Sequence, residues 1–185
     1  MMKKIVIVGP ESTGKSTLSQ ELSQHYANHY PTAWVPEYAR EFLDELDRPY
    51  TYEDLLTIAK GQLALEEQTG LALKEAAGNQ PSLLFVDTDM MVMQVWSEFV
   101  FDKCDPFILN EVVRRNYDHY LLMQTDLPWT YDKLREYPDQ ERRNRLFQHY
   151  YDILQRQSTG WSIISGLGKE RTNYAIRIID NLIAG

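Results

Sequence analysis

The most constraining feature of this chain is a glycine-bearing segment near its start. Residues 9–16 read Gly-Pro-Glu-Ser-Thr-Gly-Lys-Ser, which fits the pattern G-x-x-x-x-G-K-[ST]. The segment follows the apolar run Ile5–Val8, typical of a buried strand, and a helical pattern begins at Lys15. A strand, this loop and a helix in that order form a phosphate-binding loop. We therefore expect an α/β fold that binds a nucleoside triphosphate.

The chemistry of this phosphate loop (residues 9–16) predicts its ligands. Glycines allow the backbone N–H groups to converge on phosphate oxygens, and the helix that follows adds its positive end. The Lys15 ammonium reaches the β- and γ-phosphates, and the Ser16 hydroxyl binds Mg²⁺. The expected nucleotide contacts are Gly9, Glu11, Ser12, Thr13, Gly14, Lys15 and Ser16. We expect ATP with Mg²⁺ as cofactors, and the choice between ATP and GTP stays open.

Composition narrows the class of protein. The 185 residues suggest one domain, residues 1–185, and the formal charge of −8 without a basic stripe argues against nucleic-acid binding. Neither a membrane-spanning stretch nor a signal peptide is predicted, and Cys104 is the only cysteine, so we expect a cytoplasmic location. The four histidines show no metal-ligand spacing. The sequence leaves the oligomeric state open.

Apolar β-rich runs alternate with helical patterns along the whole chain. This alternation predicts a five-stranded parallel sheet with helices on both faces, a three-layer α/β arrangement with ligands at the carboxyl ends of the strands. The predicted strands are 5–8, 32–35, 83–86, 120–123 and 161–164. The predicted helices are 15–30, 37–46, 52–76, 90–101, 106–116, 139–158 and 170–183.

Two acidic residues follow the third predicted strand, which reads Leu83–Val86. Asp87 and Asp89 stand directly after it. A carboxylate at such a strand end is the usual partner of a phosphate loop, because it holds the water shell of Mg²⁺. An acid here also caps a following helix. We assign Asp87 to the metal and the cap to Asp89, with the exchange of these roles as the alternative.

A carboxylate and an arginine follow the second predicted strand. Glu37 lies where an acceptor hydroxyl loses its proton, so it is a candidate general base or sugar-binding residue. Arg40 lies three residues further, on the same helical face, and is a candidate for neutralising charge on the transferred group. The alternative is an ordinary surface pair in a first helical turn.

A polar segment after the fourth predicted strand is a candidate lid, residues 126–145. Its arginines suit phosphoryl transfer, and a closing lid excludes water. Arg135 is the candidate within the lid, whereas a solvated helix face is the alternative for Arg142, Arg143 and Arg145. Trp129 either stacks on an aromatic ligand or packs in the core.

After the fifth predicted strand, the small residues of Ser165–Gly168 form either an adenine site or a plain turn.

These motifs together make the chain similar to a known family. It resembles the ribosylnicotinamide kinase domain of the bacterial NadR family, over nearly its whole length and in the same order. The matching elements are Gly9–Thr17, Pro36–Glu41 (Pro-Glu-Tyr-Ala-Arg-Glu), Ile58-Ala59 with Gln62, Phe85–Asp89, and Asp126-Leu-Pro-Trp followed by Asp132 and Leu134-Arg135. One departure is Lys133, where the family often has glycine.

The resemblance implies a P-loop NTPase fold of the nucleoside-kinase type, with strand order 2-3-1-4-5. It implies transfer of the γ-phosphoryl group of ATP to the 5′-hydroxyl of nicotinamide riboside, a step of NAD biosynthesis, and it adds Thr17 to the nucleotide contacts. We expect the catalytic residues to be Lys15, Glu37, Arg40, Asp87 and Arg135. We expect the nucleoside to contact Glu37, Tyr38, Arg40, Asp89, Trp129 and Asp132, with Ser16 and Asp87 at the metal.

The resemblance is to the kinase domain only, so we expect neither adenylyl transfer nor repression from this chain. Two other functions stay open at this point. One is a kinase of the same fold that phosphorylates another nucleoside. The other is a regulatory ATPase or NTP switch, which would bind a partner in a nucleotide-dependent way and need no phosphate acceptor.

Overall fold

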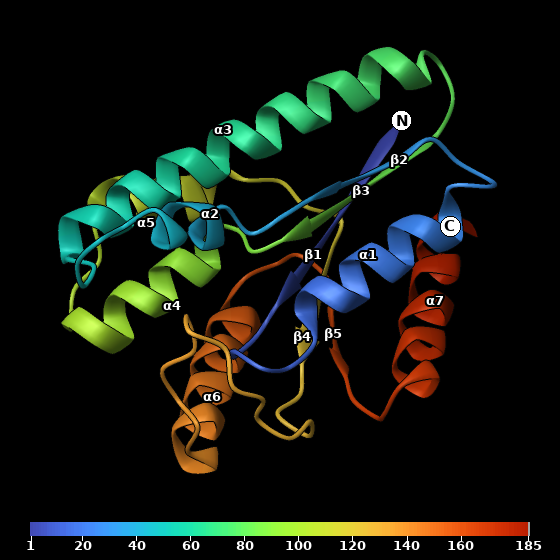
Figure 1. Cartoon of the computed structure of the whole chain (residues 1–185). Helices are drawn as coiled ribbons and strands as arrows, with labels where there is room; N and C mark the ends of the chain where they lie inside the picture. Colours follow the sequence, from blue (N-terminus) through green and yellow to red (C-terminus); the bar gives the residue numbers. More distant parts are fainter. Residues whose placement is uncertain (185) are drawn as a thin grey trace.

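A computed structural model describes residues 1–184 of the chain. Its centre is a parallel sheet of five strands in the order β2-β3-β1-β4-β5 (Figure 1). The strands are β1 Met2–Val8, β2 Thr32–Val35, β3 Ser82–Asp87, β4 His119–Met123 and β5 Trp161–Ile164. This confirms both the parallel α/β sheet and the predicted strand order.

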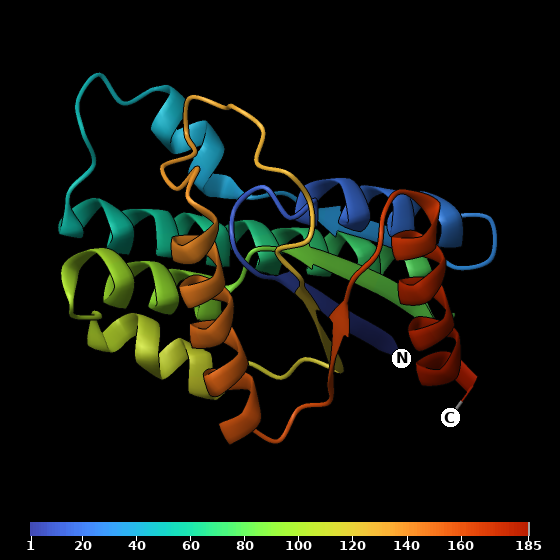
Figure 2. The ribbon, with the colours of Figure 1, turned by 90° about the horizontal axis from the view of Figure 1, so that it is seen from below.

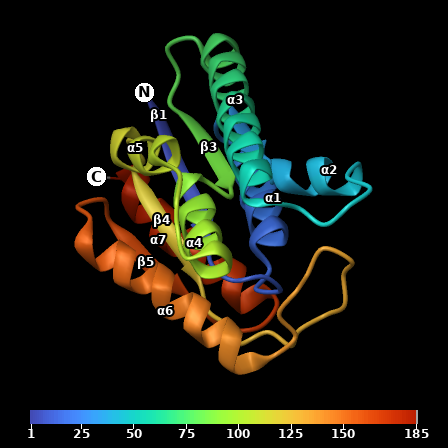
Figure 3. The same cartoon turned by 90° about the vertical axis from the view of Figure 1, so that its left-hand side faces the viewer.

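Helices cover both faces of the sheet. Figure 3 looks onto the face covered by α3, α4 and α6, while α1 and α7 lie behind the sheet. The helices are α1 Lys15–Tyr26, α2 Tyr38–Asp44, α3 Tyr52–Ala77, α4 Met90–Phe101, α5 Pro106–Arg114, α6 Gln140–Arg156 and α7 Lys169–Ala184.

The alternation of side chains along β1 explains these three layers. Ile5 and Ile7 pack against α1 and α7, while Val6 and Val8 pack on the opposite face. All four are at most 1% exposed. Because successive strand residues point to opposite faces, a strand buried on both sides must be apolar throughout.

Some predicted boundaries differ from the observed ones by a few residues, and β1 begins at Met2 rather than Ile5. Helix α1 ends at Tyr26 rather than Tyr30, and the amide of Tyr30 bonds the carbonyl of Tyr26 in a closing turn. Helix α6 begins at Gln140, one residue later than predicted, because Asp139 is its N-cap and accepts from the amide of Arg142. Cap residues favour helix starts by satisfying free N–H groups.

The carboxyl ends of β1, β2, β3 and β4 lead into the segments that carry the predicted site. Figure 2 shows the connection after β4, coloured yellow to orange, arching out and returning at α6. Residues 126–139 form neither helix nor strand, and we call them the lid loop; residues 140–145, included in the predicted lid, form the start of α6. In residues 1–184 no helix combines the length and apolar character that crossing a membrane requires.

Candidate active site

A cavity of about 810 Å³ lies at this end of the sheet. The phosphate loop, the start of α2, the end of β3 and the lid loop all line it. Among the predicted site residues, it is lined by Gly9, Glu11, Ser12, Thr13, Gly14, Lys15, Ser16, Thr17, Glu37, Tyr38, Arg40, Asp87, Asp132 and Arg135. The structure therefore brings together every predicted residue except Asp89 and Trp129.

The phosphate loop has the backbone that its glycines predict. Gly9 has φ +138°, and a Cβ there would lie 2.9 Å from the carbonyl oxygen of Met123, so no larger residue fits. Gly14 has φ +81° and precedes α1 as its N-cap. The Lys15 ammonium donates to the carbonyl oxygens of Gly9 and Pro10, at 2.9 Å each. The loop thus presents a helix start and a lysine to the cavity, as an anion site requires.

Asp87 lies next to this loop because of strand register. Residue Asp87 of β3 pairs with Ile7 of β1, two residues before Gly9. Its carboxylate is fully buried, and neither oxygen has a hydrogen-bond partner within residues 1–184. Burial, and secondarily the negative charge of Glu37, raise the pKa of Asp87 to about 6, against the opposing effect of Lys15.

A buried carboxylate without a hydrogen-bond partner normally has a cation or water as its neighbour. This observation fits a Mg²⁺ ion held between Asp87 and Ser16, both of which line the cavity. No group of three or more His, Cys, Asp or Glu side chains that could hold a metal occurs in residues 1–184. A Mg²⁺ ion that keeps waters and phosphate oxygens as its remaining ligands needs no such cluster.

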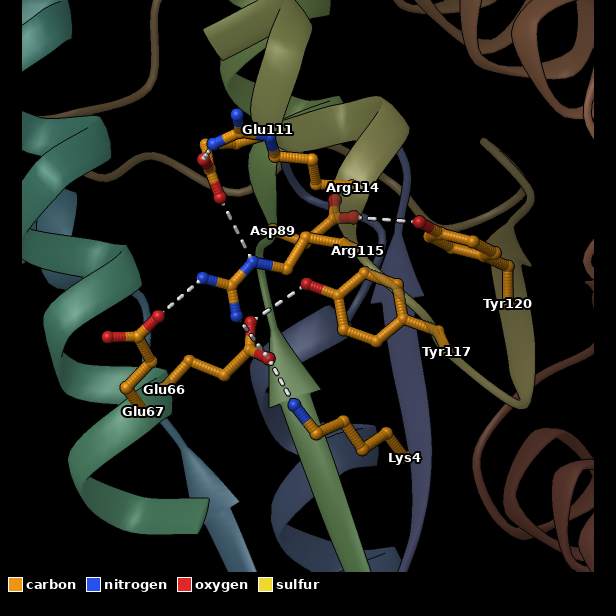
Figure 4. Close-up of polar contacts among 9 residues, drawn as sticks. All are labelled: Lys4, Glu66, Glu67, Asp89, Glu111, Arg114, Arg115, Tyr117 and Tyr120. Atoms are coloured by element: carbon orange, nitrogen blue, oxygen red, sulfur yellow. Dashed lines mark hydrogen bonds and ion pairs between the residues drawn. The ribbon is translucent and has the colours of Figure 1, made fainter. Parts of the chain in front are cut away.

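The expectation that Asp89 contacts the nucleoside is not supported, because Asp89 does not line the cavity. One oxygen accepts from the amides of Met91 and Val92 and caps α4, at 3.1 and 3.3 Å. The other accepts from the Tyr120 hydroxyl at 3.0 Å, as Figure 4 shows. The division in which Asp89 takes the cap and Asp87 faces the site is the one observed.

Glu37 and Arg40 face each other in the first turn of α2. Arg40 Nε lies 3.4 Å from Glu37 Oε2, and Arg40 Nη1 lies 3.0 Å from Asp132 Oδ2 of the lid loop. The predicted shared face of Glu37 and Arg40 is confirmed. Burial lowers the pKa of Arg40, but the bond to Asp132 and the nearby Glu37 outweigh it and leave the pKa raised. Arg40 is therefore a permanent positive charge in the cavity.

The lid loop contacts the phosphate loop directly. Arg135 donates to the Ser12 hydroxyl at 3.3 Å and to the carbonyl of Thr130 at 2.6 Å. Trp129 is half-buried and belongs to none of the core clusters, so the core-packing alternative is wrong. It does not line the cavity either, and its stacking on an aromatic ligand stays a prediction. Its indole N–H donates to Glu11 Oε1 at 2.9 Å. Trp129 therefore joins the two loops.

The later arginines differ in what they contact. Arg145 pairs with Glu141 on an exposed helix face, as the alternative for this group predicted. Arg143 is only 2% exposed and donates to the carbonyl of Leu127 at 3.1 Å, which ties α6 to the lid loop. Lys133 pairs with Asp44 of α2 at 2.8 Å, so the departure from the family pattern adds a second link between lid and α2.

An aromatic wall of the cavity was not predicted from the sequence. Beyond the phosphate loop the cavity is lined by Trp34, Tyr50, Trp96, Phe99, Tyr137 and Tyr150. Tyr50 and Trp96 meet edge to face with centroids 5.1 Å apart, and Phe99 meets Tyr137 at 5.4 Å. These side chains come from separate elements, and only their abundance, 12% aromatic residues, hints at them in the sequence.

Arg171 was also missed. It is 5% exposed at the start of α7 and donates to the carbonyl of Thr13 in the phosphate loop and to Asp126. Asp126 in turn accepts from the amide of Gly166 at 2.7 Å. None of the residues 165–168 lines the cavity, so an adenine site there stays a prediction.

Comparisons with known proteins agree with the predicted family and fold. A family model described as an AAA domain matches residues 4–171. The "Trifunctional NAD biosynthesis/regulator protein NadR" of Salmonella typhimurium is 27% identical over 140 residues, which cover 72% of this chain and 31% of that protein. The chain thus spans about a third of the length of this relative. The predicted resemblance to NadR is confirmed.

Solved structures show the same fold. A NadR protein in complex with NR superposes with a TM-score of 0.73 at 18% identity, over 100% of this chain and 50% of that chain. The thymidylate kinase of Ehrlichia chaffeensis superposes with a TM-score of 0.66 at 16% identity, over 96% and 98% of the two chains. The fold is therefore that of P-loop kinases.

Proposed function

We propose that this chain, which belongs to the AAA domain family, is a kinase that transfers phosphate from ATP to a nucleoside. The acceptor that we propose is nicotinamide riboside, and the product is its 5′-phosphate, which serves NAD biosynthesis. One observation carries the proposal. A single cavity is lined by the phosphate loop, Glu37, Arg40 and an aromatic wall. It is also lined by Asp87, whose carboxylate is buried without a hydrogen-bond partner in residues 1–184.

The residues divide into a donor and an acceptor group. The amides of the phosphate loop and Lys15 bind the triphosphate of ATP. Ser16 and Asp87 would hold Mg²⁺, which would supply positive charge to offset that of the phosphates. In the transfer, the acceptor 5′-oxygen bonds to the γ-phosphorus, the bond to the β-phosphate oxygen breaks, and Glu37 takes the hydroxyl proton. Arg40 and Arg135 stabilise charge on the transferred group.

The aromatic wall favours nicotinamide riboside over neutral nucleosides. Its pyridinium ring is flat and positively charged, and aromatic faces attract such cations. Tyr50, Trp96 and Tyr137 line this part of the cavity, and Glu136 beside them adds negative charge. The similarity to NadR, one structure of which contains NR, supports the same acceptor.

The test is an ADP-release assay with Mg·ATP over a panel of nucleosides. We expect nicotinamide riboside to stimulate ADP release most, and to be recovered as its 5′-phosphate. Lys15→Ala is the control for the site, because it removes the charge that stabilises the migrating phosphate, and it should abolish the stimulation without unfolding the chain.

Other outcomes would overturn the proposal in distinct ways. Stimulation by another nucleoside alone would keep the kinase and replace the acceptor. ATP hydrolysis that no nucleoside stimulates, together with nucleotide-dependent binding of a protein partner, would favour the regulatory ATPase.

A further inference from the structure

Glu11 is an acidic residue inside a loop that binds anions. A carboxylate close to a triphosphate is repelled by it, and this repulsion strengthens where water is excluded. Such a residue is tolerated only if other groups engage its charge. The hydrogen bonds of Glu11 show which groups these are.

The Glu11 carboxylate accepts three hydrogen bonds from the lid loop. Oε1 accepts from the indole N–H of Trp129 at 2.9 Å and from the amide of Tyr137 at 2.8 Å. Oε2 accepts from the amide of Glu136 at 2.9 Å. The donors lie at both ends of the stretch 129–137, so one carboxylate closes this stretch into a loop.

The neighbouring residue of the phosphate loop, Ser12, contacts two further residues within the same stretch. The Ser12 hydroxyl accepts from the amide of Thr130 at 2.9 Å and from Arg135 at 3.3 Å. Ser12 has φ +58°, a left-handed conformation that is uncommon for a residue with a side chain. The phosphate loop and the lid loop are thus joined through two consecutive residues.

The stretch closed by Glu11 carries groups that the proposed reaction needs. Asp132 and Arg135 both lie between the Glu11-bound ends, and both line the cavity. We propose that Glu11 is a positioning residue that anchors the lid loop on the phosphate loop, so that the loop that binds the triphosphate also sets the place of Arg135. Hydrogen bonds to an ionised carboxylate are stronger than neutral ones, which suits an anchor.

The first test uses spectroscopy and proteolysis, and does not depend on activity. Glu11→Ala removes all three hydrogen bonds, so we expect the fluorescence emission of Trp129 to move to longer wavelength. Trp129→Phe identifies which part of the total tryptophan emission comes from Trp129. Trypsin should cleave faster after Lys133 and Arg135, the basic residues of the lid loop. Glu11→Gln keeps one acceptor oxygen and should fall between wild type and Glu11→Ala. Glu75→Gln, at an exposed position of α3, is the matched control.

The second test is kinetic and rests on the proposed function. Glu11→Ala should lower kcat by about 10- to 100-fold, as expected for misplaced catalytic groups. The Kd for Mg·ADP should change far less, because the phosphate-binding amides and Lys15 remain.

The outcomes separate the two proposals. If wild type phosphorylates no nucleoside, the proposed function fails, and the emission and trypsin results still decide the role of Glu11. A Glu11→Ala protein with wild-type Trp129 emission and wild-type cleavage would overturn the anchor. A loss of Mg·ADP binding with an unchanged lid loop would also overturn it, because Glu11 would then act on the nucleotide itself.

Discussion

Arg40 and Asp132 form an ion pair between two walls of the cavity, with 3.0 Å between Nη1 and Oδ2. The same guanidinium lies 3.4 Å from Glu37 through Nε. Arg40 therefore joins the carboxylate at the start of α2 to the lid loop. The planar guanidinium suits this role, because its Nε and Nη1 donors lie on different atoms and reach the two carboxylates from separate positions.

This geometry predicts that Arg40→Lys is not a conservative change. The lysine keeps the charge, but its three donors sit on one nitrogen and cannot occupy both of the separate positions that Nε and Nη1 hold. We therefore expect kcat to fall by about tenfold or more. Steady-state kinetics with the best acceptor measures this. Lys133→Ala is the control, since it breaks a lid-to-α2 pair whose side chains are 66% and 49% exposed and should contribute little. Equal losses in both variants would contradict a specific role for Arg40.

A second prediction concerns the close approach of Gly61 to the acceptor side of the cavity. A Cβ on Gly61 would lie 2.1 Å from Cε1 of Tyr38. The Tyr38 backbone cannot easily withdraw, because its amide donates to Gln62 Oε1 at 2.7 Å and Gln62 also donates to Pro36 O at 3.2 Å. We expect Gly61→Ala to displace the ring, to raise the acceptor KM, and to lower the free energy of unfolding by about 1–3 kcal/mol.

The control for this substitution lies on the same helix. A Cβ on Gly70 would meet Leu84 at 3.6 Å, an ordinary contact. Gly70→Ala should therefore stabilise α3 by about 0.5–1 kcal/mol and leave the acceptor KM unchanged. An acceptor KM that Gly61→Ala does not alter would refute the proposed link between this glycine and the cavity.

The local features of the site were predictable from the sequence. The phosphate loop follows from two glycines, a lysine and their neighbouring strand and helix, and Asp87 follows from its position at the end of β3. Each of these depends on a few adjacent residues. The strand order came from the family resemblance, since alternation alone gives a parallel sheet without its order.

Features that depend on distant residues were not predictable. The partner of Trp129 is Glu11, 118 positions away, and the partners of Arg171 are Thr13 and Asp126. The sequence shows that Trp129 is costly to expose, but not what it contacts. Periodicity likewise locates helices without showing which aromatic side chains meet in one cavity.

A third prediction concerns the buried charges beside α3, away from the cavity (Figure 4). Glu66 is 2% exposed and accepts from Lys4 at 2.9 Å, from Tyr117 at 2.8 Å and from Arg115 at 3.5 Å. Glu66→Ala removes the counter-charge of Lys4 and leaves the Tyr117 hydroxyl without its acceptor, while Arg115 keeps Glu67 and Glu111. It should therefore lower the free energy of unfolding by about 3 kcal/mol. Urea denaturation measures this, and kcat of the folded protein should not change.

The adjacent Glu67 is the matched control. It also pairs with Arg115, at 2.8 Å, but its side chain is 59% exposed. Glu67→Ala should cost at most about 1 kcal/mol, because solvent screens an exposed pair. Similar losses for the two variants would show that burial does not decide the strength of this network.

The last prediction follows from the buried Asp87 carboxyl, whose pKa burial raises to about 6 from 3.8. Between these values the folded chain holds a proton that the unfolded chain has lost, so the free energy of unfolding falls as pH rises through this window. The loss amounts to roughly 3 kcal/mol at neutral pH without Mg²⁺. Asp87→Asn should therefore raise Tm at pH 7.5 while abolishing Mg²⁺-dependent transfer.

The pH profile distinguishes Asp87 from its neighbour. Burial also raises the pKa of Asp89, to about 7. The stability of Asp87→Asn should therefore still fall with rising pH, by the part that Asp89 contributes. Mg·ADP needs the ionised Asp87 and should bind more tightly as pH rises through about 6. Calorimetry in buffers of different ionisation enthalpy should detect proton release on binding at pH 6. If Tm depends on pH in the same way in Asp87→Asn as in wild type, the Asp87 carboxylate is not the charge that destabilises the folded chain.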